Sequence, residues 1–280
     1  MRAAVALLFA CSSASAQLAD TSAAGVEKFT ARARVATERF KDVNTAVAES
    51  YVKVGPDFPA MGEHWVNGEL IMRGELDPSR PAILTYTTIA GRPTLTGIVY
   101  ALALKRGETP PMLPRGAGWH DHVGSIDEES LLFGHDHHSD DDIRLVVMHA
   151  WIWQRNPAGI FATDNWALPF ARMGLSAPST PRQDAARALA LLAGSASYFS
   201  RLFAAVGDLD DAGIGNVDAV LERQRSALEQ WWNARPNSAE LASAELTQLD
   251  ATWARLARDV QAAVGPAAAR RLSRLWAPDH

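Results

Sequence analysis

The hydrophobic pattern changes period twice along the chain, near Gly55 and again near Gly174. On both outer sides, apolar residues recur every three or four positions, which is typical of amphipathic helices. Between the two glycines, β-branched and aromatic residues form short blocks bounded by turn residues, which is typical of strands. The pattern therefore predicts an α+β fold with a long N-terminal helix, a central, mainly antiparallel β-region and a C-terminal helical bundle.

The individual elements can be placed within this outline. Residues 83–89 and 94–104 surround a turn and predict a β-hairpin, and residues 143–153 and 159–170 predict two further strands. Beyond Gly174, we expect helices that begin at Thr180-Pro181, near residue 217 and at a capping box formed by Asn237 and Glu240. One apolar stripe predicts a single helix over about residues 22–50, and it consists of Phe29, Ala33, Ala36, Phe40, Val43, Val47 and Tyr51.

The first sixteen residues have the three parts of a secretory signal peptide. Arg2 supplies the basic end, residues 3–10 are apolar, and residues 14–16 form an A-x-A cleavage motif. The apolar run is too short to span a bilayer, so we expect cleavage and a periplasmic or secreted protein. A lipid anchor at Cys11, which follows a loose lipobox, is the alternative. The remaining chain is expected to divide into residues 17–175, with the β-region, and a helical module over residues 176–280.

Composition excludes several functions. Cys11 is the only cysteine, so the cleaved protein can form neither a disulfide nor a thiolate metal site. The net charge of −5 and the absence of a basic stripe argue against nucleic acid as a partner. No later apolar run is long enough to be a membrane span. A partner is therefore expected to be a small molecule or another protein.

Histidines are concentrated in the β-region. Seven of the eight lie between His64 and His149, and His120 and His122 form an H-x-H pair. In an extended segment the side chains of such a pair point to the same side and start about 7 Å apart, so both imidazoles can reach one ion. Two surface histidines in a loop are the alternative for this pair. The acidic run that follows contains Glu128, which could serve as an oxygen ligand or a general base. Alternatively, the acids begin a short helix.

Two more histidines are candidate ligands. His149 falls on an apolar strand face that contains tryptophans, where a histidine is either a ligand or a core residue bonded to the backbone. His64 lies between the first helix and the first strand of the hairpin, where it is either a ligand or a link between them. The tract of residues 135–142 has no apolar residue and is expected to be a solvated loop that captures metal weakly at most. Motifs for hydrolase nucleophiles, P-loops, dinucleotide sites and zinc proteases are absent, and a cupin barrel fits the H-x-H spacing poorly.

Several strings in this region together resemble a family of uncharacterised exported bacterial proteins. They are G-E-H-W-V-N from Gly62, W-H-D-H from Trp119 with the D-E-E run, and H-A-W-I-W from His149 with N-P-A-G and D-N-W-A-L-P-F. A shorter related group has a similar G-x-H-[WY]-V-N segment and a similar H-x-W-x-W-x-x-N-P-x-G segment, and tends to carry glutamate in the strand where this chain has Val99. The resemblance spans about residues 36–175 and implies a shared site at His64 and His149, without implying a reaction.

The sequence thus predicts an exported protein that binds one divalent transition metal through His64, His120, His122 and His149, with Glu128 beside it. Zinc is the first choice, and nickel, copper and iron are the alternatives for a site of imidazoles without thiolate. Such a metal would activate water or polarise a substrate oxygen if the protein is an enzyme. The alternative function is a non-catalytic periplasmic metal carrier, or a binding or structural module whose histidines are structural.

Overall fold

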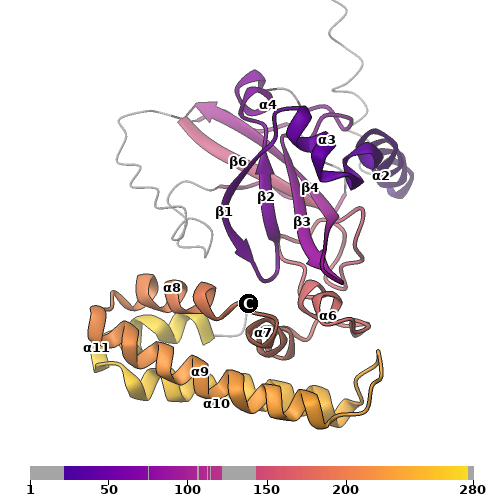
Figure 1. Cartoon of the computed structure of the whole chain (residues 1–280). Coiled ribbons are helices and arrows are strands. Elements are labelled where there is room, and N and C mark those ends of the chain that lie inside the picture. Colours follow the sequence, from indigo (N-terminus) through magenta and orange to yellow (C-terminus); the bar gives the residue numbers. More distant parts are fainter. Residues whose placement is uncertain are drawn as a thin grey trace, which may run out of the picture.

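The computed structural model describes residues 22–74, 76–105, 107–111, 113, 115–121 and 143–276. The α+β prediction is confirmed. A six-stranded antiparallel sheet in the order β1-β2-β3-β4-β6-β5 stands above a layer of helices (Figure 1). Its strands are β1 (Val52–Phe58), β2 (Gly62–Val66), β3 (Ile83–Ile89), β4 (Arg92–Lys105), β5 (His120–Asp121) and β6 (Ile143–Ala150).

The N-terminal helix is interrupted, so the expectation of one helix over residues 22–50 was wrong. The chain forms α2 (Ala23–Thr37), a 3-10 turn η1 (Glu38–Lys41) and α3 (Val43–Ala48). Asp42 causes the interruption, because it has an extended backbone and its carboxylate accepts a hydrogen bond from the amide of Asn44, as an N-cap does. The break leaves Phe40 fully buried against Tyr51, with ring centroids 5.2 Å apart, and leaves Val47 54% exposed.

The predicted hairpin is confirmed as β3 and β4. Its tight turn has positive φ angles of 50° at Ala90 and 75° at Gly91, as a type I′ turn requires. β6 ends at Ala150, three residues earlier than predicted, because the amide of Trp151 bonds the carbonyl of Ile160 and that of Trp153 turns to Thr96. The strand predicted over residues 159–170 is not formed. This segment consists of turns and leads into the short helix α6 (Leu168–Arg172).

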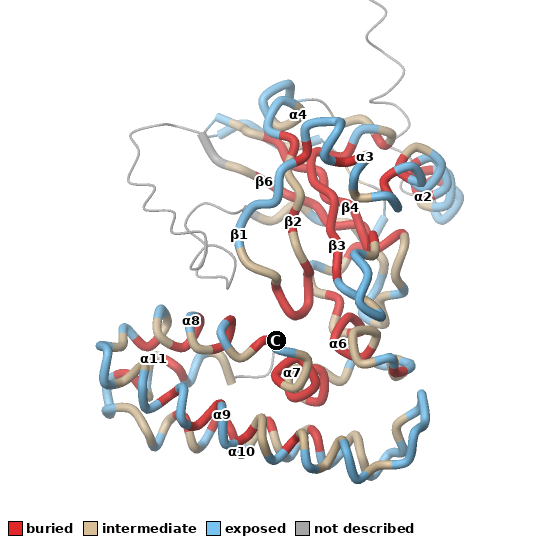
Figure 2. The backbone as a smooth tube through the Cα atoms, viewed as in Figure 1, coloured by how far each residue is buried: buried red, intermediate tan, exposed pale blue. Residues whose placement is uncertain are grey.

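Apolar side chains cover both faces of the sheet. One face packs on α2 through a buried cluster, and α4 (Gly68–Arg73) lies over part of the other. The first cluster includes Phe29, Leu84, Tyr86, Ile98, Tyr100 and Met148, and the second includes Ala82, Ile83, Val99, Ala101 and Val147. Figure 2 shows that the central strands are the most buried part of the sheet.

The C-terminal helices form the layer beneath the sheet. They are α7 (Gln183–Leu192), α8 (Ala196–Gly207), α9 (Asp211–Ala234), α10 (Ser243–Ala263), α11 (Pro266–Leu272) and the 3-10 turn η2 (Ser273–Trp276). The helix predicted to begin at the Asn237 and Glu240 box begins at Ser243 instead, where Glu245 accepts a hydrogen bond from the amide of Ala242. Among the described residues no single helix has the length and apolarity of a membrane span, although the bent pair α7 and α8 together reach both.

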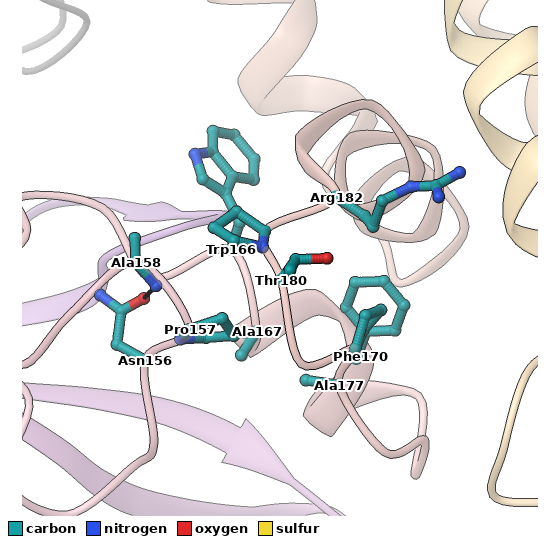
Figure 3. A pocket seen from close by; sticks show the side chains of 11 residues that line it. Asn156, Pro157, Ala158, Trp166, Ala167, Phe170, Ala177, Thr180 and Arg182 are labelled. Atoms are coloured by element: carbon teal, nitrogen blue, oxygen red, sulfur yellow. Dashed lines mark hydrogen bonds between the residues drawn. The ribbon is translucent and has the colours of Figure 1, made fainter.

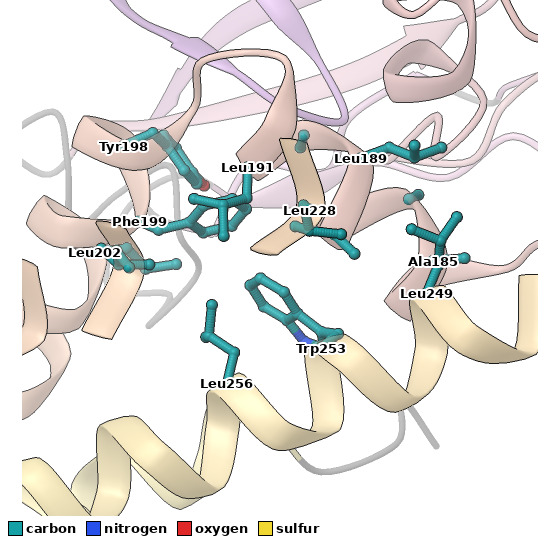
Figure 4. Close-up of a cluster of buried hydrophobic side chains, with 14 of the residues drawn as sticks. Ala185, Leu189, Leu191, Tyr198, Phe199, Leu202, Leu228, Leu249, Trp253 and Leu256 are labelled. Carbon is teal, nitrogen blue, oxygen red and sulfur yellow. The ribbon is translucent and has the colours of Figure 1, made fainter. Parts of the chain in front are cut away.

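The helical layer and the lower end of the sheet share one buried cluster. Phe199 and Trp253 meet at its centre, with ring centroids 4.9 Å apart (Figure 4). Phe58 of β1, Trp151 and Phe170 belong to the same cluster, although they come from the β-region of the chain. The end of the sheet that carries these residues is therefore packed directly on the helices.

Candidate functional site

Three of the predicted histidines lie together on one face of the sheet. The ring centroid of His149 is 6.0 Å from that of His64 and 5.4 Å from that of His120. His64 and His149 are 3% and 2% exposed, and both nitrogens of each ring are shielded from solvent, while His120 is partly exposed. His149 is thus the centre of a cluster that draws on β2, β5 and β6.

The strands between His64 and His149 explain how two residues so far apart in the sheet can meet. His64 pairs with Thr85 of β3, which pairs with Gly97 of β4, and neither residue fills the space between the imidazoles with a large side chain. The register of β3 and β4 shifts immediately after Thr85. Such a bulge bends the strand and re-aims side chains, as bulges beside functional sites often do. Small side chains at this point therefore make room for the cluster.

Gly97 also determines the position of Trp151. A Cβ atom at Gly97 would lie 3.0 Å from the indole of Trp151 and 3.0 Å from the hydroxyl of Thr85. The indole is held at its other end by a hydrogen bond from Nε1 to the carbonyl of Ala162, and its centroid lies 6.0 Å from that of His149. Trp151 therefore forms one wall of the cluster, and it can do so only because residue 97 has no side chain.

Phe58 forms the opposite wall. Its ring meets the ring of His64 edge to face, with centroids 5.4 Å apart and planes at 88°. Tyr198 of α8 also packs against Phe58, with ring centroids 5.8 Å apart. The imidazoles are therefore enclosed by aromatic rings from the sheet, and the helical layer supports one of these rings.

Threonines supply the remaining polar groups of this face. The hydroxyls of Thr85 and Thr96 lie 3.2 Å apart, and the Thr96 hydroxyl also donates to the carbonyl of Thr85. The hydroxyl of Thr87 is buried and has no hydrogen-bond partner among the residues that the structure describes. Glu63, the neighbour of His64 in β2, belongs to the opposite face, and its carboxylate accepts a hydrogen bond from Lys53 at 2.6 Å.

Trp119, the neighbour of His120, packs on the α2 face, and its Nε1 donates to the carbonyl of Pro111. The remaining predicted site residues cannot be placed. His122 and Glu128 lie outside the described residues, as does the tract of residues 135–142. Within the described ranges, His, Cys, Asp and Glu side chains form no group of three or more that could already hold a metal ion.

The D-N-W-A-L-P-F string, residues 164–170, and Arg172 hold the turn between β1 and β2 through hydrogen bonds, and we call these residues the clamp. The sequence did not predict this role. The amide of Asn165 bonds the carbonyl of Ala60 in the turn between β1 and β2, and its side chain accepts a hydrogen bond from the amide of Ala167 in a turn that precedes α6. Arg172, which follows the string, binds both carboxylate oxygens of Asp57 at 2.6 and 2.8 Å. Only the turn made by the Asn165 side chain could be expected from the sequence.

The outer side of this clamp is hollowed. Trp166, Phe170 and Pro157 line the hollow together with Arg182, whose guanidinium pairs with Asp250 of α10 (Figure 3). The guanidinium of Arg187 lies 4.8 Å from the ring of Trp166. The hollow therefore lies where the clamp meets the helical layer. Its lining residues Arg182 and Trp166 already have partners within the protein.

Comparison with protein-family models, with curated proteins and with solved structures finds no match to this chain.

Proposed function

We propose that the protein binds one divalent transition metal ion through His64, His120 and His149. The observation that carries the proposal is the spacing of the rings around His149, which is 5.4 and 6.0 Å between centroids. Two imidazoles that bind one tetrahedral zinc ion at about 2.1 Å have ring centroids about 5.3 Å apart. The cluster therefore has the spacing of a shared ion, although the rings of His120 and His149, at 21° to each other, must turn to aim their nitrogens at it.

The surroundings favour such a turn. Rotation of an imidazole about its second side-chain torsion is broad, so the nitrogens can converge without moving the backbone. Phe58 and Trp151 pack against the rings and exclude water, which strengthens a bond between a neutral imidazole and a cation. His122 and Glu128 complete the proposed set as a further ligand and as an oxygen ligand or general base.

Zinc suits this donor set best, and nickel, copper and iron are the alternatives, because imidazole binds all four. When bound, the ion would supply a Lewis acid that activates water or polarises a substrate oxygen. The chain's own residues would hold the ion, exclude water and, at Glu128, accept a proton. We place this protein in the periplasm or outside the cell after removal of residues 1–16.

The test is metal analysis of the protein purified without a histidine tag. We expect about one equivalent of zinc, loss of this ion in His149→Ala and His64→Ala, and retention of it when His135, His137 and His138 are all replaced by alanine. If the untagged protein binds no divalent ion at micromolar concentration, the proposal is wrong and the histidines are structural. If the triple variant alone loses the ion, the wrong histidines have been chosen.

A further inference from the structure

Phe58 connects the histidine cluster to the rest of the molecule. Its ring is fully buried and contacts the rings of both His64 and Tyr198 edge to face. A ring held edge to face between two neighbours has little freedom, because close packing leaves no space into which it can rotate. The orientation of the His64 imidazole therefore depends on where Phe58 is held.

The backbone of Phe58 is held from α6. Arg172 donates a hydrogen bond to the carbonyl of Phe58 at 3.2 Å, in addition to its two bonds with Asp57. The Arg172 side chain is only 9% exposed, whereas the Asp57 side chain is 35% exposed, so the guanidinium end of this fork is the part removed from water. A bidentate arginine fixes both distance and direction, which a lysine cannot do.

The turn between β1 and β2, which connects Phe58 to His64, is held tightly in place. Gly62 has a positive φ of 78°, and a Cβ atom there would lie 2.3 Å from the carbonyl oxygen of Tyr86. The turn therefore sits directly on β3, while Asn165 bonds its Ala60 carbonyl at 2.8 Å. A displacement of Phe58 is consequently passed to His64 rather than absorbed by the turn.

We propose that Arg172 and Tyr198 are positioning residues for His64, which they act on through Phe58, so that α6 and α8 set the affinity of the histidine cluster for its ion. This inference rests on the proposed metal site. Arg172 contacts Asp57 and Phe58, Tyr198 contacts Phe58, and both residues come from segments without histidine. The helical layer would thus determine the geometry of a site built on the sheet, rather than only adding to its stability.

The experiment compares Arg172→Lys and Tyr198→Leu with two matched controls. Tyr198→Phe keeps the ring against Phe58 and should behave as the wild type. Arg39→Lys removes another bidentate pair, with Glu49, which is more exposed and lies away from the cluster. We expect zinc affinity to fall about tenfold or more in the first two variants and to stay within about twofold in the controls, as for residues that orient a metal ligand.

A second measurement separates this inference from the metal proposal. The ring-proton NMR signals of His64, assigned with His64→Ala in metal-free protein, report the orientation of its ring relative to Phe58. They should shift in Arg172→Lys and Tyr198→Leu and not in the controls. If they do not shift in whichever of these variants folds, the inference is wrong, whether or not zinc binds. If they shift while the wild type binds no ion, the positioning role stands for His64 and the metal proposal fails.

Discussion

The two faces of the sheet are built from alternate residues of the same strands, yet they differ in composition. We also expect them to differ in how they respond to pH. Toward α2, the face carries aliphatic side chains and tyrosines whose hydroxyls all bond backbone carbonyls. On the other face, beside the apolar patch under α4, lie His64, His149, Thr85 and Gly97. The first face is an apolar core whose hydroxyls are hydrogen-bonded, whereas the second buries histidines and threonines.

Because successive side chains of a strand point to opposite faces, one strand can supply core residues to one face and site residues to the other. Leu84 and Thr85 are neighbours in β3, and both are almost fully buried, at 0% and 1% exposed. Leu84 fills the α2 face, while Thr85 lies between the histidines and leaves room for them. Substitutions one residue apart should therefore affect different properties, which makes the comparison testable.

Leu84→Ala should give the largest loss of stability. Removal of a fully buried leucine leaves a cavity, and we expect the free energy of unfolding to fall by about 2–5 kcal/mol in urea titrations. The zinc content of the folded protein should stay at the wild-type value. Thr85→Ala, one residue along, should cost less stability. Loss of zinc from folded Leu84→Ala would show that the two faces are not independent.

Gly97→Val should damage both properties, because the added side chain meets Trp151 and Thr85. The nearest atoms lie at only 3.0 Å from a Cβ, and the indole is held by Ala162, so overpacking should cost about 1–3 kcal/mol. Zinc affinity should fall because the wall beside His149 moves. Gly68→Ala, where a Cβ meets no atom within 4 Å, is the control. If Gly97→Val binds zinc as the wild type does, the space above residue 97 is not part of the site.

Some features of these two faces could be predicted from the sequence, and others could not. The hairpin and the position of His149 followed from period two and from a two-residue turn, which are local properties of the chain. The resemblance placed His64 and His149 in one site, but the geometry by which they meet could not be derived from the sequence, because it depends on strand order, on a bulge after Thr85 and on the missing side chain at Gly97. The break at Asp42 and the clamp made by Arg172 were missed for a similar reason, since their partners lie far away or their signals are single residues.

The faces should also respond to opposite ends of the pH scale. Burial raises the pKa of Tyr51, Tyr86 and Tyr100, so the folded protein keeps these phenols protonated where the unfolded chain ionises them. The unfolded state then binds fewer protons, and stability is lost as pH rises above about 10, by up to about 1.4 kcal/mol per pH unit for each tyrosine. Zinc should instead leave as pH falls through about 6.5, because imidazoles must be neutral to bind it.

Tyr100→Phe separates these responses. It removes a hydrogen bond to the carbonyl of Pro78 and should cost about 1 kcal/mol at neutral pH. Above about pH 10, the free energy of unfolding should also fall less steeply with pH than in the wild type, because one buried tyrosine no longer contributes. The pH midpoint of zinc release should stay unchanged. Unfolding measured by urea between neutral pH and pH 11, beside zinc retention in acid, checks both. If the free energy of unfolding falls with pH as steeply as in the wild type, the tyrosines of the α2 face do not determine the loss of stability at high pH.

Thr87→Val should have the smallest effect and tests how the polar face is held together. The Thr87 hydroxyl is buried without a partner among the described residues, so its replacement by a methyl group of similar size removes a desolvated polar group and loses no described bond. We expect stability to stay within about 0.5 kcal/mol of the wild type or to rise. Thr85→Val, by contrast, breaks the contact with the Thr96 hydroxyl and should cost about 1 kcal/mol. Thermal unfolding of the two variants at one pH gives the difference directly. If Thr87→Val is the more destabilised, its hydroxyl is bound in the folded protein, and this end of the face belongs with the histidines as a binding surface rather than with the core.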